Sequence, residues 1–228
     1  MITNRQLILP YAAPYLAYVG IASLPDHLVS IEVSYVLRLI LIPLLLLWGW
    51  RWYCSLTGPR SLGGSVAVGV VTGLVGLLVW LGLLAPFVAP DDATPWSSGE
   101  FTLRLLSAGL LVPLFEELMM RGYAFRLALQ WDQARKQGDS NALLTSLDDR
   151  SINDVTPGEW TWAAVLLSTI AFTAGHTLPE WPASIAYGLG MAWLWIQRKD
   201  LIACIVAHAT TNIALAFYVY FTGHWHFW

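Results

Sequence analysis

Seven long runs of mostly apolar residues follow one another along the 228-residue chain, and together they predict helices that cross a membrane. A helix needs about 20 such residues to cross the hydrocarbon core of a bilayer. The runs lack the alternation of apolar and polar residues that membrane barrel strands show, so we expect helices. The predicted spans are Leu7–Leu24, Val33–Trp52, Gly63–Val88, Phe101–Leu129, Trp160–Leu178, Pro182–Ile196 and Leu201–Phe221.

The composition indicates the same class of protein. Charged residues make up 12% of the chain and hydrophobic residues 57%, whereas a soluble domain carries about 25% charged residues. This balance excludes an ordinary soluble domain and an intrinsically disordered chain. The net charge of -3 argues against a nucleic-acid partner, which requires a basic surface. We therefore expect an all-α transmembrane bundle, a single integral membrane domain over residues 1–228 that is surrounded by lipid.

The distribution of basic residues predicts the orientation of this bundle. With seven spans (six to eight fit the hydropathy), nine Lys and Arg residues from Arg5 to Lys199 fall on one side. By the positive-inside rule, the N-terminus is then cytoplasmic and the C-terminus outside, and residues 131–159 form a polar cytoplasmic loop. The loops on the opposite side carry no Lys or Arg outside the predicted spans, and their charged residues are Asp26, Glu32, Asp91, Asp92, Glu100 and Glu180.

Two smaller patterns concern packing. Ser65, Gly69 and Gly73 recur at every fourth position of the third span, which predicts a face that another helix approaches closely. Cys54 and Cys204 fit neither a disulfide framework nor a CxxC motif. We expect both to be buried free thiols.

Ionisable residues inside the spans are candidates for function, because each one costs roughly 2.5–3.5 kcal/mol at the centre of a bilayer. We expect Arg38 and Arg104 to snorkel toward the membrane surface or to pair with a carboxylate. The others lie on three separate predicted helices, and such a set is expected to converge on one cavity. They are Glu116, Glu117, Arg121, His176 and His208, with Asn212 as a polar companion.

Helical spacing separates the roles of the two glutamates in the fourth span. Glu117 and Arg121 are four residues apart, so they share a face and can pair. Glu116 points about 100° away from Glu117 and has no partner on its own helix. Pro113 removes a backbone hydrogen bond just before Glu116, which predicts a kink there.

The same four-residue spacing recurs in the fifth and seventh spans. Phe172 and His176 share one face near the end of the fifth span, and His208 and Asn212 share one face in the middle of the seventh. A core or interfacial histidine and hydrogen bonding between helices are the alternative readings of these two pairs. At 1.5 Å per residue, His176 is expected to lie roughly 10 Å nearer the outer face than Glu116.

Taken in order, Glu116-Glu117-x-x-x-Arg121, Phe172-x-x-x-His176 and His208-x-x-x-Asn212 resemble the three signature motifs of the CPBP family. These proteins are glutamic-type intramembrane proteases related to the Rce1 CAAX prenyl endopeptidase. The resemblance covers residues 101–221, which it implies are the catalytic core, and the first hundred residues carry no part of it. The short Trp-rich chain is more similar to bacterial members, which implies an inner (plasma) membrane location.

The resemblance implies an endopeptidase that cuts near the C-terminus of a membrane-associated protein and needs no cofactor. Glu116 would be the general base that activates water, and His176 would hold or polarise that water. His208 and Asn212 would stabilise the oxyanion, and a donor in this role is worth about 2.7–4 kcal/mol. The supporting residues would be Glu117, Arg121 and Phe172.

Two alternatives to this reading stay open. Glu116, His176 and His208 are residue types that can bind zinc, so a zinc-dependent variant of the protease is possible from residue types alone. The chain lacks the HExxH motif of a helical zinc protease, which disfavours that class. A non-catalytic membrane protein, which binds a partner, confers immunity or transports a solute, is the second alternative.

Overall fold

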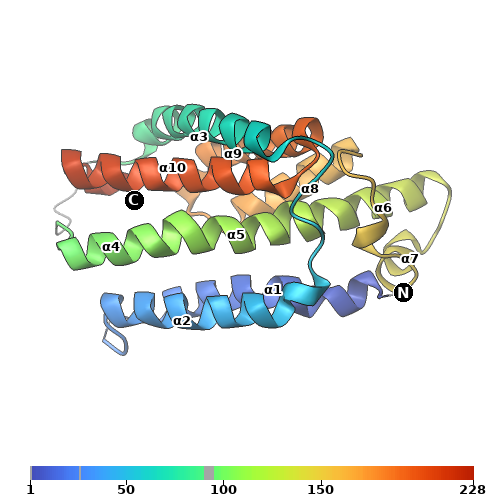
Figure 1. Cartoon of the computed structure of the whole chain (residues 1–228), viewed down its shortest axis with the longest axis horizontal. Coiled ribbons are helices and arrows are strands. Elements are labelled where there is room, and N and C mark those ends of the chain that lie inside the picture. The colour runs from blue at the N-terminus through green and yellow to red at the C-terminus, as the bar shows by residue number, and fades with distance from the viewer. Residues whose placement is uncertain (1, 26, 90–94) are drawn as a thin grey trace.

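The computed structural model describes residues 2–25, 27–89 and 95–228, and these ranges are helical without any strand (Figure 1). The acidic loop residues Asp26, Asp91 and Asp92 lie outside the described residues. Each of the seven predicted spans contains a helix. The helices are α1 (Asn4–Ala22), α2 (Ile31–Gly49), α3 (Leu62–Leu84), α4 (Ser98–Leu106), α5 (Val112–Glu117), α6 (Phe125–Lys136), α7 (Ala142–Asp148), α8 (Trp162–Thr173), α9 (Trp181–Arg198) and α10 (Leu201–Thr222).

One continuous helix, built from α4, α5 and α6, runs through the middle of the bundle from Ser98 to Lys136. The α1–α2 pair packs on one side of it, and α10 packs with α3 on the other (Figure 1). The chain termini lie at opposite ends, so we call these the N-terminal end and the C-terminal end of the bundle. The long helix therefore contacts the helices on both sides of the bundle and positions the side chains in its middle.

The long helix changes its hydrogen-bonding pattern on both sides of Glu116 and Glu117. The segments Ser107–Leu111 and Leu118–Ala124 are π-helical, with wider turns than an α-helix. Pro113 lies just after the first of them and has no N–H to donate, and Val112 N–H bonds back five residues to Ser107 O. The irregularity predicted at Pro113 is thus a π-helical turn within a helix that continues.

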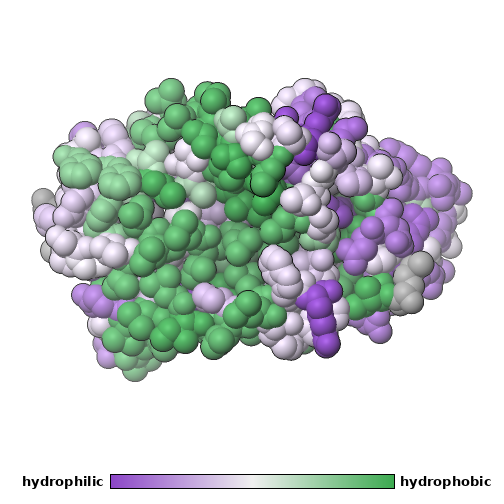
Figure 2. All heavy atoms as spheres, viewed as in Figure 1, coloured by the Kyte–Doolittle hydropathy of each residue, from purple (hydrophilic) through white to green (hydrophobic). Residues whose placement is uncertain are grey.

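Among the residues that the structure describes, three helical stretches are long and apolar enough to cross a membrane by length and composition alone: Ile31–Trp52, Leu62–Phe87 and Leu201–Thr222. The apolar helix α8 is shorter, with 12 residues. Figure 2 shows apolar residues over the middle of one face and polar residues gathered at the N-terminal end, as in an integral membrane protein. The number of spans, and their sidedness, remain predictions.

The polar segment 131–159 is largely folded. Helix α6 continues into it as far as Lys136, and α7 lies within it. Asn4, at the start of α1, donates from its Nδ2 to Gln130 Oε1 at 2.6 Å and to Ser146 O at 2.7 Å. The predicted loop is therefore tied to the first helix by buried hydrogen bonds.

The small-residue face of the third span packs directly against α10, as its spacing predicts. A Cβ atom placed on Gly69 would lie 2.8 Å from the carbonyl oxygen of Ala203, and one on Gly73 would overlap the carbonyl of Ala207. Backbone therefore meets backbone along this contact. Cys54 and Cys204 are buried free thiols, as predicted.

Gly73→Ala is expected to lower the unfolding temperature of the purified protein, because the added methyl group displaces α10 from α3. Overpacking of this kind costs about 1–3 kcal/mol. Gly82→Ala, in the same helix, is the matched control, since a Cβ there has no neighbour within 4 Å. Thermal unfolding in detergent measures both. Equal unfolding temperatures for the two variants would contradict the close packing.

Candidate active site

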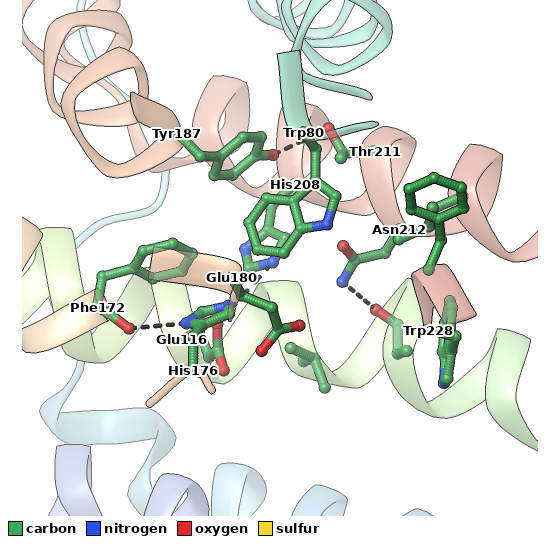
Figure 3. Close-up of a pocket in the computed structure, with 14 residues that line it drawn as sticks. Trp80, Glu116, Phe172, His176, Glu180, Tyr187, His208, Thr211, Asn212 and Trp228 are labelled. Carbon is green, nitrogen blue, oxygen red and sulfur yellow. Dashed lines mark hydrogen bonds and ion pairs between the residues drawn. The ribbon is translucent and has the colours of Figure 1, made fainter. Parts of the chain in front are cut away.

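Four polar residues of the three motifs, namely Glu116, His176, His208 and Asn212, meet at one cavity of about 210 Å³ inside the bundle (Figure 3). Glu116 reaches it from α5, His176 from the turn after α8, and both His208 and Asn212 from α10. The side chain of Glu116 is 16% exposed, which leaves its carboxylate accessible from the cavity. Three helices that are far apart in sequence thus supply one site.

His176 and Glu116 lie at the same cavity although simple spans predict a separation of roughly 10 Å along the membrane normal. The reason is the start of α8. Gln133, near the end of α6, hydrogen-bonds to Glu159, so α8 begins beside the extended end of the long helix. From this common level, the distance along α8 from Trp162 to His176 is roughly 21 Å, and the distance along the long helix from Gln133 to Glu116 is roughly 26 Å. The two residues therefore reach a similar height in the bundle.

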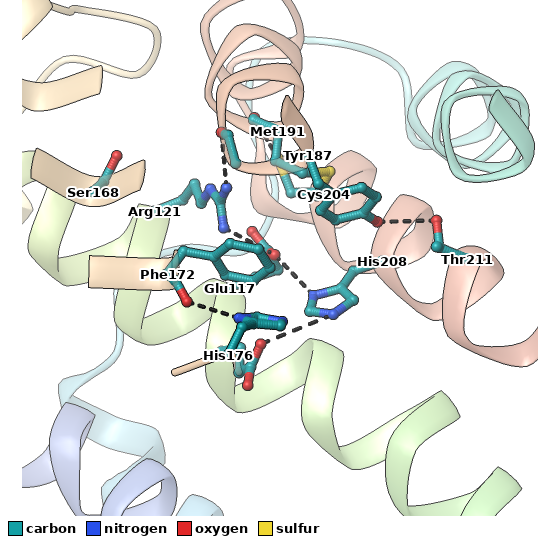
Figure 4. A network of polar contacts seen from close by, with 12 residues as sticks. Glu117, Arg121, Ser168, Phe172, His176, Tyr187, Met191, Cys204, His208 and Thr211 are labelled. Atoms are coloured by element: carbon teal, nitrogen blue, oxygen red, sulfur yellow. Dashed lines mark hydrogen bonds and ion pairs between the residues drawn. The ribbon is translucent and has the colours of Figure 1, made fainter. Parts of the chain in front are cut away.

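Glu117 is the centre of a buried ionic network (Figure 4). Its Oε1 accepts from Arg121 Nη1 at 3.2 Å and from His208 Nδ1 at 3.0 Å, and the side chains of Glu117 and Arg121 are fully buried. Arg121 Nη2 also donates to the carbonyl of Gly188 at 3.1 Å, and its guanidinium lies 5.4 Å from the ring centre of Phe172. The predicted Glu117–Arg121 pair is therefore present, and it also holds His208.

His208 links the two glutamates. Because a carboxylate oxygen only accepts, the contact with Glu117 places a proton on Nδ1 of His208. The other ring nitrogen, Nε2, faces Glu116 Oε2 at 3.9 Å, which is too long for a direct hydrogen bond. Both residues line the cavity, so a reactant there can contact the Glu116 carboxylate and Nε2 of His208.

His176 is oriented by the backbone of its own helix. Its Nδ1 lies 2.9 Å from the carbonyl oxygen of Phe172, which can only accept, so Nδ1 carries a proton. The ring lies between Phe172, at 4.6 Å between ring centres, and Trp80 of α3, at 5.4 Å. In the neutral ring, Nε2 is then an acceptor at the cavity.

Asn212 is held by a contact that its spacing did not predict. Its Nδ2 donates to the carbonyl oxygen of Ala108 at 2.8 Å, and Ala108 belongs to the first π-helical segment. An amide nitrogen has two hydrogens, so one remains for another acceptor. The bond orients the side chain of Asn212 along the cavity wall (Figure 3).

Several cavity residues come from outside the three motifs. Trp80 is on α3, and Tyr187 of α9 donates to Thr211 Oγ1 at 3.0 Å. Phe227 and Trp228 line the cavity from the chain's last turn. Trp80 is one of 13 tryptophans and has no polar neighbour in its span, so no signal in the sequence singles it out.

The zinc alternative needs a set of donors that converge on one point. Within residues 2–25, 27–89 and 95–228, no three His, Cys, Asp or Glu side chains are arranged to hold a metal ion. The Nδ1 of His208 is directed at Glu117 and that of His176 at a backbone carbonyl. Each histidine therefore offers only its Nε2 to the cavity.

The family model of the Rce1-like type II CAAX prenyl endopeptidases matches residues 98–214, which is just over half of the chain. The chain therefore belongs to this family, and the match contains all three motifs. Comparison with curated proteins and with solved structures gives no match. The family is one of intramembrane proteases, in agreement with the apolar helices and with a membrane-associated substrate.

Proposed function

We propose that this protein is an intramembrane endopeptidase that hydrolyses a peptide bond near the C-terminus of a membrane-associated protein. The observation that carries the proposal is the convergence of Glu116, His176 and His208 on one cavity, each from a different part of the chain. Each group has an atom free for a reactant: a carboxylate and two imidazole Nε2 atoms. Together they suffice for the addition of water to a carbonyl carbon, without a nucleophilic side chain.

In the proposed reaction, Glu116 takes a proton from a water molecule while the water oxygen attacks the carbonyl carbon of the substrate. His176 accepts the second hydrogen of that water at Nε2 and so holds the water in place. The new C–O bond creates a tetrahedral oxyanion. Collapse of this intermediate breaks the C–N bond, and the proton on Glu116 passes to the leaving nitrogen. One water is consumed, and a carboxylic acid and an amine are formed; the acid then passes its proton to the amine or to water and leaves as a carboxylate.

His208 and Asn212 are the proposed donors to the oxyanion. His208 can donate from Nε2 only when both ring nitrogens carry protons. Glu117 holds Nδ1 of His208 at 3.0 Å, so Nε2 is the ring nitrogen directed at the cavity, and in the doubly protonated form two cations, Arg121 and His208, balance two carboxylates. Asn212 adds its second amide hydrogen. Glu117, Arg121 and Phe172 act as positioning residues that fix His208 and His176.

Membranes from cells that express the Glu116→Gln variant are a suitable substrate source, because they are expected to contain uncut precursors. Purified wild-type protein in detergent is added to these membranes, and new C-termini are identified by mass spectrometry. The proposal expects defined shortened proteins that appear with time. Repeated failure to form any new C-terminus, with folded wild-type protein, would favour a partner-binding or immunity role instead.

The proposed reaction uses no metal, so chelators are expected to leave its rate unchanged within about twofold, because Glu116 activates the water without a metal ion. The measurement repeats the same assay after dialysis against EDTA and 1,10-phenanthroline. Loss of activity that added zinc restores would instead establish the zinc-dependent variant, with Glu116, His176 and His208 as ligands.

A further inference from the structure

Two arginines lie close together inside the bundle but apart from the catalytic cavity. Arg38 is seven residues from the start of α2, and Arg104 is six residues from the start of α4. Both helices begin at the C-terminal end of the bundle, so both arginines lie roughly 10 Å along the helix axis from that end.

The two guanidinium groups share one aromatic ring. The ring centre of Tyr35 lies 4.0 Å from the guanidinium carbon of Arg38 and 5.3 Å from that of Arg104. Tyr18 contacts the Arg38 cation at 4.8 Å and Trp96 the Arg104 cation at 4.5 Å. Aromatic faces attract a cation but carry no net charge, so these rings neutralise neither positive charge.

No carboxylate of the described residues neutralises these charges. Across those residues, no ion pair within 4.0 Å includes Arg38 or Arg104, unlike Arg121 with Glu117. Arg38 is only 6% exposed, and Nε is its one hydrogen-bond donor to a described group, the carbonyl of Ser34. Arg104 donates from Nη1 to the Tyr35 hydroxyl, while its Nε is buried without a partner.

Arg38 is buried and Arg104 is half-buried, and cations so placed are costly unless an anion joins them. The neighbouring surface indicates which anion. Exposed leucines lie deeper along the same two helices, Leu41 on α2 and Leu110 in the π-helical segment after α4, and they are 39% and 56% exposed. A molecule with a phosphate at the arginines and apolar chains along these leucines matches both features.

We propose that Arg38 and Arg104 form a binding site for the phosphate group of an anionic phospholipid. Arginine suits this ligand because its planar group offers paired donors to phosphate oxygens. The Nη atoms of Arg38 and the Nη2 of Arg104 donate to no described protein group and are the proposed phosphate contacts. The site is independent of the proteolytic activity, so neither proposal depends on the other.

Native mass spectrometry of the purified full-length protein in detergent tests this site. The probes are dioleoyl phosphatidylglycerol, dioleoylglycerol, which has the same chains without phosphate, and inorganic phosphate. The wild type is expected to retain phosphatidylglycerol in preference to dioleoylglycerol. Arg38→Gln and Arg104→Gln are each expected to weaken its binding about fivefold, the effect of one arginine near an anionic lipid.

Arg51→Gln is the matched control, because Arg51 is an exposed arginine that stacks on Trp52 at the opposite end of α2. It is expected to leave phosphatidylglycerol binding unchanged. Equal binding of phosphatidylglycerol and dioleoylglycerol by the wild type would overturn the proposal, even if the variants fail to fold. Binding of inorganic phosphate without the lipid would overturn the assignment to a phospholipid.

Discussion

Glu116→Gln is expected to lower the rate of peptide hydrolysis by about 10²–10⁴-fold, the usual contribution of a general base. The amide keeps the size of the side chain but cannot take a proton from water. Glu116 forms no hydrogen bond to the described protein groups and is 16% exposed, so the fold does not depend on its charge. Rates of C-terminal shortening, measured with purified variants on precursor-containing membranes, give the comparison.

Glu32→Gln, an exposed change in the first turn of α2, is the control and should leave the rate unaltered. The unfolding temperature of Glu116→Gln should stay within a few degrees of the wild type. A folded Glu116→Gln protein that cuts at the wild-type rate would exclude Glu116 as the base. The reaction would then need another group at the cavity.

Arg121→Met is expected to have the largest effect on stability, about 3–5 kcal/mol in the free energy of unfolding. The substitution removes the cation that pairs with Glu117 and leaves a carboxylate that is fully buried with only His208 beside it. The contact with the Gly188 carbonyl is lost as well. Urea or thermal unfolding in detergent measures the loss.

The double variant Glu117→Gln/Arg121→Met separates charge from packing. It leaves no unpaired charge, so part of the stability lost in Arg121→Met should return. Hydrolysis should stay low, because His208 then lacks the carboxylate that orients its ring through Nδ1. Arg135→Met is the control and should cost no more than about 1 kcal/mol, because Arg135 is exposed and Lys136 still pairs with the same Asp132 carboxylate at 2.7 Å. A double variant less stable than Arg121→Met would contradict this reading.

The sequence predicts the composition of the site better than its depth. The four-residue spacing of Glu117 and Arg121 predicts their pair, because neighbours on a helix face are fixed by the helix itself. Local spacing does not predict the partner of His208. Its bond to Glu117 joins residues 91 positions apart, and only the packing of α10 on the long helix brings them together.

The depth of His176 shows why simple spans mislead. Assigning spans by the length of apolar runs assumes that each span begins at the membrane surface, but α8 begins beside an extension of the long helix. Likewise, Trp80 reaches the site from α3, and the small residues of that span predict only close packing. The Gly73 contact sets how closely α3 approaches α10, and so where Trp80 lies. Such features arise from helix placement rather than from local spacing.

Comparison of protein C-termini in cells tests the proposed activity most directly. Cells that express the wild type or Glu116→Gln at matched levels are analysed by C-terminal mass spectrometry of their membrane and exported proteins. The proposed function predicts one or more defined shortened C-termini with the wild type, and accumulation of the longer precursors with Glu116→Gln. Identical C-termini in both, with both proteins folded and present in the membrane, would contradict a protease that depends on Glu116.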